Sequence, residues 1–248
     1  MHRRQFIGQV LSVFPAYALL AEFGVAGAAA DRPSARWIAA QDEIARALAN
    51  GEISPAAWRA DVARLTSELD LPQLLAEIDG AEIRYVGRAL PSYPVKRTIR
   101  FRDEAGERRA LRYAAAWFGF APDNVITPHA HRHMVSAHLV VEGAFRVRNY
   151  DRVRDEGDAI VIRPSVDATI EIGDVSTISP DRDNIHWFVP RGDRAATFDV
   201  IVSGLDEGQP AYDIKAIDPV RGQVLADGVI RAPIISFEES SRFYTPDV

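Results

Sequence analysis

The pattern of apolar and polar positions divides the chain into a helical part followed by a part made of strands. Between residues 33 and 79, the apolar side chains recur at the three- and four-residue spacing of amphipathic helices. These residues are Trp37, Ile44, Leu48, Trp58, Val62, Leu65 and Leu69. Asn50-Gly51 is a stop signal, and Ser54 before Pro55 is typical of a helix start. The pattern therefore predicts helices that pack on a larger domain.

From Tyr93 onward the pattern changes to short strands separated by turn residues. The predicted strands are 96–102, 109–118, 135–141, 145–150, 159–162, 168–172, 185–189 and 197–203. Many short strands with regular turns indicate a β-sandwich or β-barrel. We expect a mainly β protein with a helical extension over 31–90 and a barrel over 91–210. The segment 211–248, with short apolar runs and several prolines, should pack on the barrel.

The first 30 residues have the features of a targeting segment. Arg3 and Arg4 precede a mostly apolar stretch, and small residues fill positions 26–30. The adjacent arginines resemble a twin-arginine export signal, which implies a periplasmic or exported protein. Glu22 and the short length of the apolar stretch argue against a stable membrane span after processing.

Composition narrows the classes of partner and of metal ligand. The formal net charge of −6 disfavours nucleic acids and anionic membranes as partners. The apolar fraction of 47% is enough for a real core. The chain has no cysteine, so it has no disulfides and no thiolate ligands. Any metal site must use histidine, carboxylate or water.

Five of the six histidines can be placed in one site, and four of them lie within ten residues. They are His129, His131, His133, His138 and His186. Neutral imidazole is the commonest protein ligand for transition metals. An H-x-H pair in an extended strand points both rings to one face. The histidine pattern therefore predicts a metal site.

The spacing around these histidines resembles the two motifs of the cupin superfamily. His129-x-His131, Ser136 and Gly143 match the spacing of the first motif, in which the third position is a glutamate. The second motif is similar to the segment 173–186, which begins with a glycine, contains Pro180 and ends at His186. The resemblance covers about residues 90–205. It implies a jelly-roll β-barrel of cupin type with His129, His131 and His186 as ligands.

A first motif with this spacing but without the glutamate resembles that of the three-histidine thiol dioxygenases, of which cysteine dioxygenase is one. That resemblance implies Fe(II), although histidine ligands with open positions also suit Zn, Mn, Ni or Cu. It further implies that an arginine near Trp117-Phe118-Gly119, here Arg100, binds the substrate carboxylate. If Ile99 faces the core, however, alternation turns Arg100 outward.

A second register remains open at the histidine cluster. His131-x-His133 can serve as the H-x-H pair, with His138 in the glutamate position, but Phe145 then stands where the motif has glycine. In the first register, His133 continues towards the barrel mouth, and His138 falls on the opposite strand face unless a bulge intervenes. If neither residue is a ligand, His133 is explained as a polar residue at the rim and His138 as a buried, hydrogen-bonded histidine.

Ser136, His133, His138 and Asp183 are therefore candidates for a supporting role or for alternative ligands. Asp183 precedes His186 in a loop and is a candidate hydrogen-bond partner for a ligand histidine.

The sequence thus predicts an exported, mononuclear metal-dependent cupin. Its expected activity is that of a non-haem iron dioxygenase acting on a small thiol or similar small acid, with O₂ as co-substrate. The alternatives are a non-catalytic cupin that binds a metal or small ligand, and a Zn or Mn cupin with hydrolase or isomerase activity. No nucleophilic triad or acid pair is legible in the sequence to favour the last of these. A homodimer is a further expectation.

Overall fold

The computed structural model describes residues 33–103, 105–211 and 213–248. The predicted export signal, residues 1–30, lies outside these described residues. Within the described ranges, no helix is both long enough and apolar enough to cross a membrane.

Three helices open the described chain: α1 (Pro33–Ala49), α2 (Pro55–Ser67) and α3 (Leu71–Asp79). The predicted start of α2 has a clear physical cause, because the Ser54 hydroxyl accepts a hydrogen bond from the backbone N–H of Ala57 at 3.1 Å. Asp70 caps α3 in the same way. The helices end at Asp79, and strand pairing begins at Glu82, earlier than the boundary expected at residue 91.

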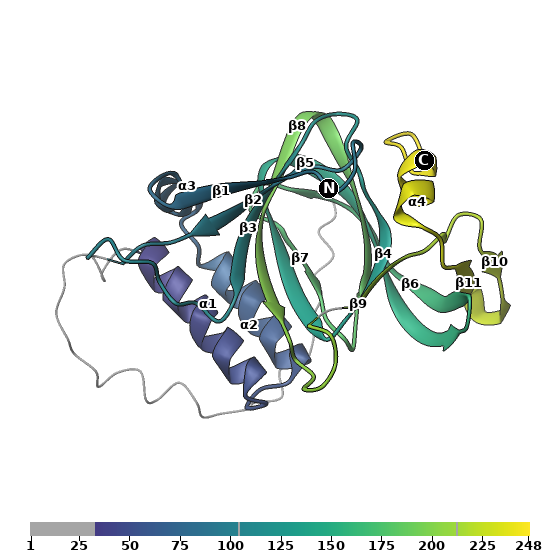
Figure 1. The fold of residues 1–248 in the computed structure, drawn as a ribbon, viewed down its shortest axis with the longest axis horizontal. Helices are drawn as coiled ribbons and strands as arrows, with labels where there is room; N and C mark the ends of the chain where they lie inside the picture. Colours follow the sequence, from purple (N-terminus) through teal and green to yellow (C-terminus); the bar gives the residue numbers. More distant parts are fainter. Residues whose placement is uncertain (1–32, 104, 212) are drawn as a thin grey trace, which may run out of the picture.

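The remaining chain forms one antiparallel sheet that curls into a barrel, closed on one side by the C-terminal segment (Figure 1). Its strands are β1 (Glu82–Gly87), β2 (Val95–Arg100), β3 (Ala114–Phe120), β4 (Ile126–Arg132), β5 (Met134–Glu156), β6 (Ala159–Glu171), β7 (Val175–Ile178), β8 (Ile185–Ser203), β9 (Asp213–Ala216), β10 (Gln223–Val224) and β11 (Ile230–Pro233). The hydrogen-bonded order is β1-β2-β3-β8-β5-β6-β11-β10, with β4 paired to β8 and β9 and with β7 paired to β5. The predicted fold class, a mainly β jelly-roll barrel with an N-terminal helical extension, is confirmed.

Three pairs of short predicted strands are in fact single long strands. β5, β6 and β8 each run through the stretch where the sequence predicts a break. Gly143 shows why, because it is a bend inside β5 and not the end of a strand. Its φ is +67°, and an added Cβ would lie 2.3 Å from the carbonyl oxygen of Arg194 on β8. Glycine is needed at this position because the two long strands approach closely as they bend.

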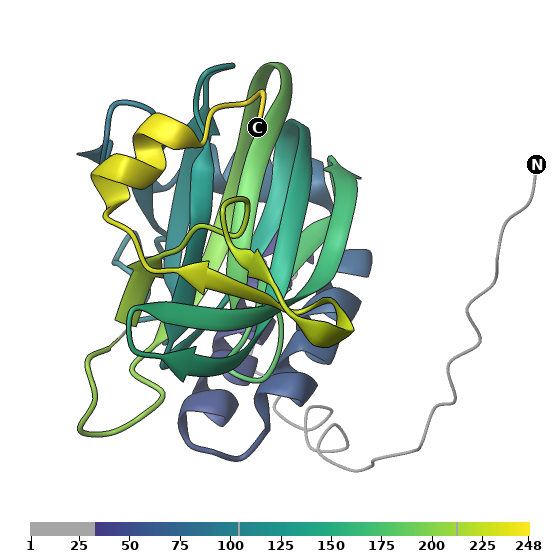
Figure 2. The same ribbon diagram turned by 90° about the vertical axis from the view of Figure 1, so that its right-hand side faces the viewer.

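The two faces of the curled sheet have different neighbours. Alternate residues of β5 and β8, among them Val135, Leu139 and Phe198, face α1–α3 and form the largest apolar cluster. The intervening residues face the barrel interior. The C-terminal segment, with α4 (Phe237–Phe243), crosses the outside of the opposite wall (Figure 2). The helices and the tail thus cover the barrel from outside and leave its interior to the residues of the strands.

Candidate metal centre

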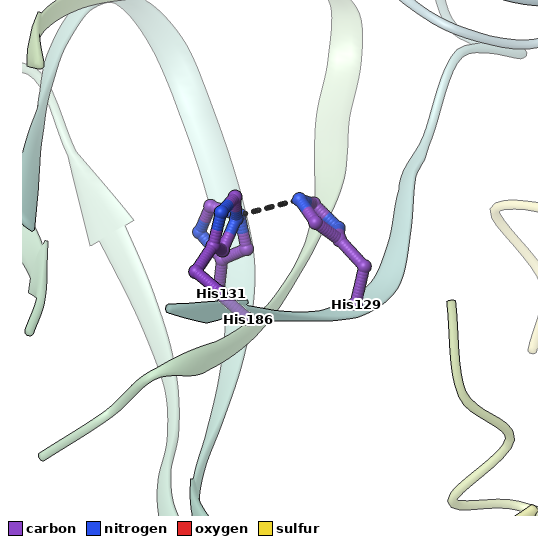
Figure 3. Close-up of side chains that lie close together, drawn as sticks. All are labelled: His129, His131 and His186. Atoms are coloured by element: carbon purple, nitrogen blue, oxygen red, sulfur yellow. Dashed lines mark hydrogen bonds between the residues drawn. The ribbon is translucent and has the colours of Figure 1, made fainter. Parts of the chain in front are cut away.

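Two neighbouring strands bring three histidines together inside the barrel. His129 and His131 alternate along β4, so both rings point to one face. His186 lies on β8 directly opposite His129 in the strand register. Figure 3 shows the three rings pointing toward one another from these strands. The three residues predicted as ligands are thus brought together by strand alternation and one cross-strand pair.

The facing atoms are the Nε2 nitrogens. His186 Nε2 lies 3.1 Å from His129 Nε2 and 3.2 Å from His131 Nε2. The Nδ1 atom of His129 lies 2.7 Å from the carbonyl oxygen of Thr127, so Nδ1 carries the proton and Nε2 is a free acceptor. One proton on His186 Nε2 can satisfy only one of its two neighbours when all three rings are neutral. A cation at the centre would satisfy all three nitrogens at once.

Burial keeps these imidazoles in the form that binds metals. All three are buried. Burial lowers the pKa of His129 to about 4, with its hydrogen bond to Thr127 opposing the shift. Burial also holds the pKa of His131 and that of His186 well below the usual value of 6.5. At neutral pH the three rings therefore offer lone pairs and no charge.

The spacing of the three nitrogens suits a single transition-metal ion. Ligand nitrogens at about 2.0–2.1 Å from an ion lie about 2.8–3.4 Å apart for octahedral or tetrahedral angles. No carboxylate of the described residues joins this group of potential ligand atoms. The Nδ1 atoms of His131 and His186 are buried without a hydrogen-bond partner. In the metal-binding tautomer both carry a proton, which water would have to accept.

A hydrogen-bonded chain of three side chains lies beside this cluster. The Ser136 hydroxyl lies 2.9 Å from His138 Nε2, and His138 Nδ1 lies 2.7 Å from Asp199 Oδ2. All three side chains are buried. The ring of His138 lies 4.8 Å from that of His186, measured between centroids. Because Asp199 accepts from Nδ1, His138 presents Nε2 as an acceptor to the Ser136 hydroxyl.

His138 lies on the same side as the ligand pair, with its ring 4.8 Å from that of His186 between centroids, because an irregularity in the strand does intervene. The chain breaks between β4 and β5 at His133, whose φ is +59°. This left-handed residue interrupts the alternation, so β5 begins with its own facing and His138 points inward. The expectation of a buried, hydrogen-bonded histidine is met.

His133 itself lies at the rim of the barrel. Its Nδ1 atom is 3.2 Å from Asp206 Oδ2, and its side chain lines a surface pocket together with His131. It is not part of the group of three converging histidines. The position agrees with the expected location towards the mouth and gives no support to the register that pairs His131 with His133.

Two other candidate residues do not reach the cluster. Arg100 lies on β2 near the edge of the sheet, with Nη1 3.9 Å from Glu82 and no contact with the histidines among the interactions of the described residues. Asp183 was expected to support a ligand histidine. It instead accepts a hydrogen bond from the Ser165 hydroxyl, while its own N–H donates to Asp151. Asp183 has φ of +53°, and the carboxylate is directed into its own loop contacts.

Sequence reasoning missed Asp199. This residue is separated from His138 by 61 positions, and only the antiparallel register of β5 with β8 places the two opposite each other. The sole signal was a polar residue in an otherwise apolar strand, since Asp199 interrupts Thr197–Ser203 at an inward-facing position. The structure therefore contains a Ser-His-Asp arrangement that the sequence did not reveal.

Comparison with known proteins finds similar solved structures but no matching family. No family model matches the chain, and no curated protein matches it. Among solved structures, it is similar to the vicilin from Solanum melongena, with 16% identity over 44% of this chain and a TM-score of 0.32. The match spans 27% of that vicilin chain, about a quarter of its length.

Two bacterial structures match over larger shares of their own length. KdgF from Halomonas sp. is 18% identical, with 50% of this chain and 88% of that chain covered and a TM-score of 0.33. An uncharacterised protein from Klebsiella pneumoniae with a double-stranded beta-helix domain is 15% identical, with 51% and 82% covered and a TM-score of 0.32. At these scores and identities, the likeness concerns the β-barrel architecture alone.

Proposed function

We propose that this chain is a mononuclear non-haem iron dioxygenase that acts on a small thiol or a similar small acid. The observation that supports the proposal is the convergence of three neutral, buried Nε2 atoms without a carboxylate among them. Three ligands on one side of an ion leave coordination positions for two small molecules. The choice of Fe(II) and of a thiol rests on the resemblance to three-histidine thiol dioxygenases.

When bound, the iron would supply the redox chemistry that joins O₂ to the substrate. The residues of the chain do the rest. The His129 ring is held by its Nδ1–H donation to Thr127, which fixes the direction of Nε2. The aromatic ring of Phe188 packs 5.4 Å from the His186 ring between centroids. These contacts orient the ligands and exclude water from one side of the site.

The Ser136–His138–Asp199 chain provides a fixed polar wall next to the centre. Asp199 sets the tautomer of His138, and His138 in turn accepts the proton of the Ser136 hydroxyl. The Ser136 oxygen keeps its lone pairs free, so it can accept a hydrogen bond from a protonated group of the substrate. We assign positioning to this chain, because its hydrogen bonds orient the Ser136 hydroxyl beside the histidine cluster.

The test is metal analysis combined with oxygen uptake. The purified protein, loaded anaerobically with Fe(II), should hold one iron per chain and consume O₂ only when a small thiol is added. The panel should contain cysteine, 3-sulfanylpropanoate and cysteamine. A zinc protein, or an iron protein with no turnover of any thiol, contradicts the dioxygenase proposal. Stable iron binding without turnover would instead favour a non-catalytic binding protein.

One observation favours a second candidate, a hydrolase. The spacing of Ser136, His138 and Asp199 is that of a nucleophile, a base and an orienting carboxylate. Ser136 is only 1% exposed, so a carbonyl substrate reaches it only if the barrel opens. Hydrolysis of a chromogenic ester by the zinc-loaded protein, lost in Ser136→Ala, would support this candidate over the dioxygenase.

A further inference from the structure

Two of the three converging histidines have no hydrogen-bond partner for Nδ1. His129 differs, because its Nδ1 atom donates to the carbonyl oxygen of Thr127 at 2.7 Å. The Nδ1 atoms of His131 and His186 are buried and unpaired among the described residues. A ring that offers Nε2 to a metal carries its proton on Nδ1, and ligand histidines almost always donate that proton to a fixed acceptor. His186 as a metal ligand therefore needs an acceptor near its Nδ1 atom.

Strand pairing places a buried amide beside His186. Asn149 on β5 lies directly opposite His186 in the register with β8. Directly opposed residues point to the same face of a sheet, with their Cβ atoms about 4.5–5.5 Å apart. That face is the barrel interior, because Val147 and Phe188, two positions away on each strand, belong to the apolar cluster inside the barrel. Asn149 is only 3% exposed, so the two side chains share one buried part of the barrel wall.

The amide of Asn149 offers an acceptor of the kind that His186 needs. Its Nδ2 atom donates to the Ser176 hydroxyl at 3.3 Å, whereas its Oδ1 atom is buried without a partner. Leaving a buried acceptor unpaired is costly. Oδ1 of Asn149 and Nδ1 of His186 each lie two bonds beyond Cβ, so rotation of the amide about its Cβ–Cγ bond can bring them together. That torsion is soft, and the long hydrogen bond to Ser176 restrains it only weakly.

We propose that Asn149 Oδ1 accepts the Nδ1 proton of His186 and so fixes the ring that presents Nε2 to the metal. When the His186 proton is on Nε2, Nδ1 and Oδ1 are both acceptors and cannot pair. A ring that gives Nε2 to a metal holds its proton on Nδ1 and can donate it to Asn149. Asn149 is thus a positioning residue that takes the place of water at this ring. The inference rests on the metal centre of the proposed function and not on its reaction with O₂.

The first test measures the affinity of the full chain for zinc, a redox-inert probe, by competition with a chelator. Asn149→Leu nearly keeps the side-chain volume and removes the acceptor, so it should weaken zinc binding about tenfold or more. Asn149→Asp supplies a carboxylate acceptor and should bind zinc at least as tightly as the wild type. Val147→Ala is the matched control for loosened packing on the same strand face. It should lower the free energy of unfolding and leave the zinc affinity of the folded protein unchanged.

The second test detects the hydrogen bond itself, by NMR of the zinc-loaded protein with isotope-labelled histidine. We expect slow exchange with water for the Nδ1 proton of His129, which Thr127 accepts, and for that of His186, which Asn149 accepts. Asn149→Leu should lose the protected His186 proton and keep that of His129, which is the internal reference. A merely structural role for Asn149 would change stability and leave both protons protected.

Wild-type zinc affinity in Asn149→Leu, no recovery of affinity in Asn149→Asp, or a His186 proton that stays protected in Asn149→Leu would overturn the inference and leave the metal centre standing. A wild-type protein that binds no zinc would refute the metal centre and with it the role of Asn149. The expected zinc and NMR results in a protein without thiol-dependent O₂ uptake would keep the role of Asn149 and refute the dioxygenase. The two proposals therefore fail in distinguishable ways.

Discussion

The two ends of the barrel interior differ in how completely their side chains are satisfied. At one end Phe120, Phe145, Phe188 and Val140 pack against one another, and the rings of Phe120 and Phe145 meet edge to face at 4.8 Å between centroids. At the other end lie the three histidines and the Ser136–His138–Asp199 chain. The ring of Phe188 touches both ends, at 5.2 Å from His138.

Several side chains of the barrel strands near the histidines have buried polar atoms without partners. They include Nδ1 of His131 and His186, Oδ1 of Asn149 and Asp199, and Oγ1 of Thr197. The register places Asn149 opposite His186 and Thr197 two residues before Asp199 on the same inward face. A folded protein rarely leaves such groups unpaired unless they serve a bound ion, water or ligand. The apolar end therefore stabilises the barrel. The polar end lowers the folding stability, because its unpaired buried groups are available to bind an ion or ligand.

The largest effect on stability should come from removing a buried aromatic ring at the apolar end. Phe145→Ala removes a fully buried ring and should lower the free energy of unfolding by about 3–5 kcal/mol. The folded fraction should still bind one metal per chain, because no ligand is touched. Denaturant unfolding and metal analysis of the folded protein measure the two quantities. Loss of the metal from well-folded variant protein would show that the two ends are not separable.

A pair of histidine variants should separate the ligands from the rim. His129→Ala removes one of three converging nitrogens and should weaken metal binding by about 100-fold or more. His133→Ala changes a histidine at the rim that pairs with Asp206, and it should keep wild-type metal affinity. Competition with a chelator gives both values. The opposite ranking would establish His131 and His133 as the ligand pair.

A smaller effect is expected from the chain beside the metal centre. Asp199→Asn takes the charge from the acceptor of His138 and should lower kcat about tenfold, with metal content and KM nearly unchanged. Asp167→Asn, a change at an exposed carboxylate on β6, is the control. Equal kcat values for Asp199→Asn and wild type would restrict the chain to a structural role.

The smallest effect is expected at Arg100. Arg100→Gln removes a partly exposed side chain whose described partner is Glu82, and exposed ion pairs contribute little. Melting temperature, kcat and KM should all equal the wild-type values within error. A raised KM for a carboxylate substrate would return Arg100 to the site.

The parts of the site that the sequence predicted depend on local geometry. His129 and His131 share a face because strand side chains alternate with a period of two, wherever the strand lies. The start of α2 at Ser54 and Pro55 is equally local. His186 was predicted as a ligand only because the segment that ends at it resembles the second motif. None of these predictions requires knowing which strands pair.

The parts that were missed depend on strand register and on single backbone angles. Asp199 meets His138 only through the pairing of β5 with β8. The facing of His138 depends on one left-handed residue, His133, which separates β4 from β5. The side chain of Arg152 is buried against Asp155, a contact that alternation along β5 does not predict. Alternation alone cannot supply such long-range contacts.

The central claim is that three histidines hold one metal ion. A crystal structure of the metal-loaded protein, with anomalous scattering recorded at the metal edge, tests it directly. We predict one ion per chain, with Nε2 of His129, His131 and His186 at about 2.0–2.2 Å. An ion held by His133 or His138 in place of His129, or no ion inside the barrel after loading, would contradict the account.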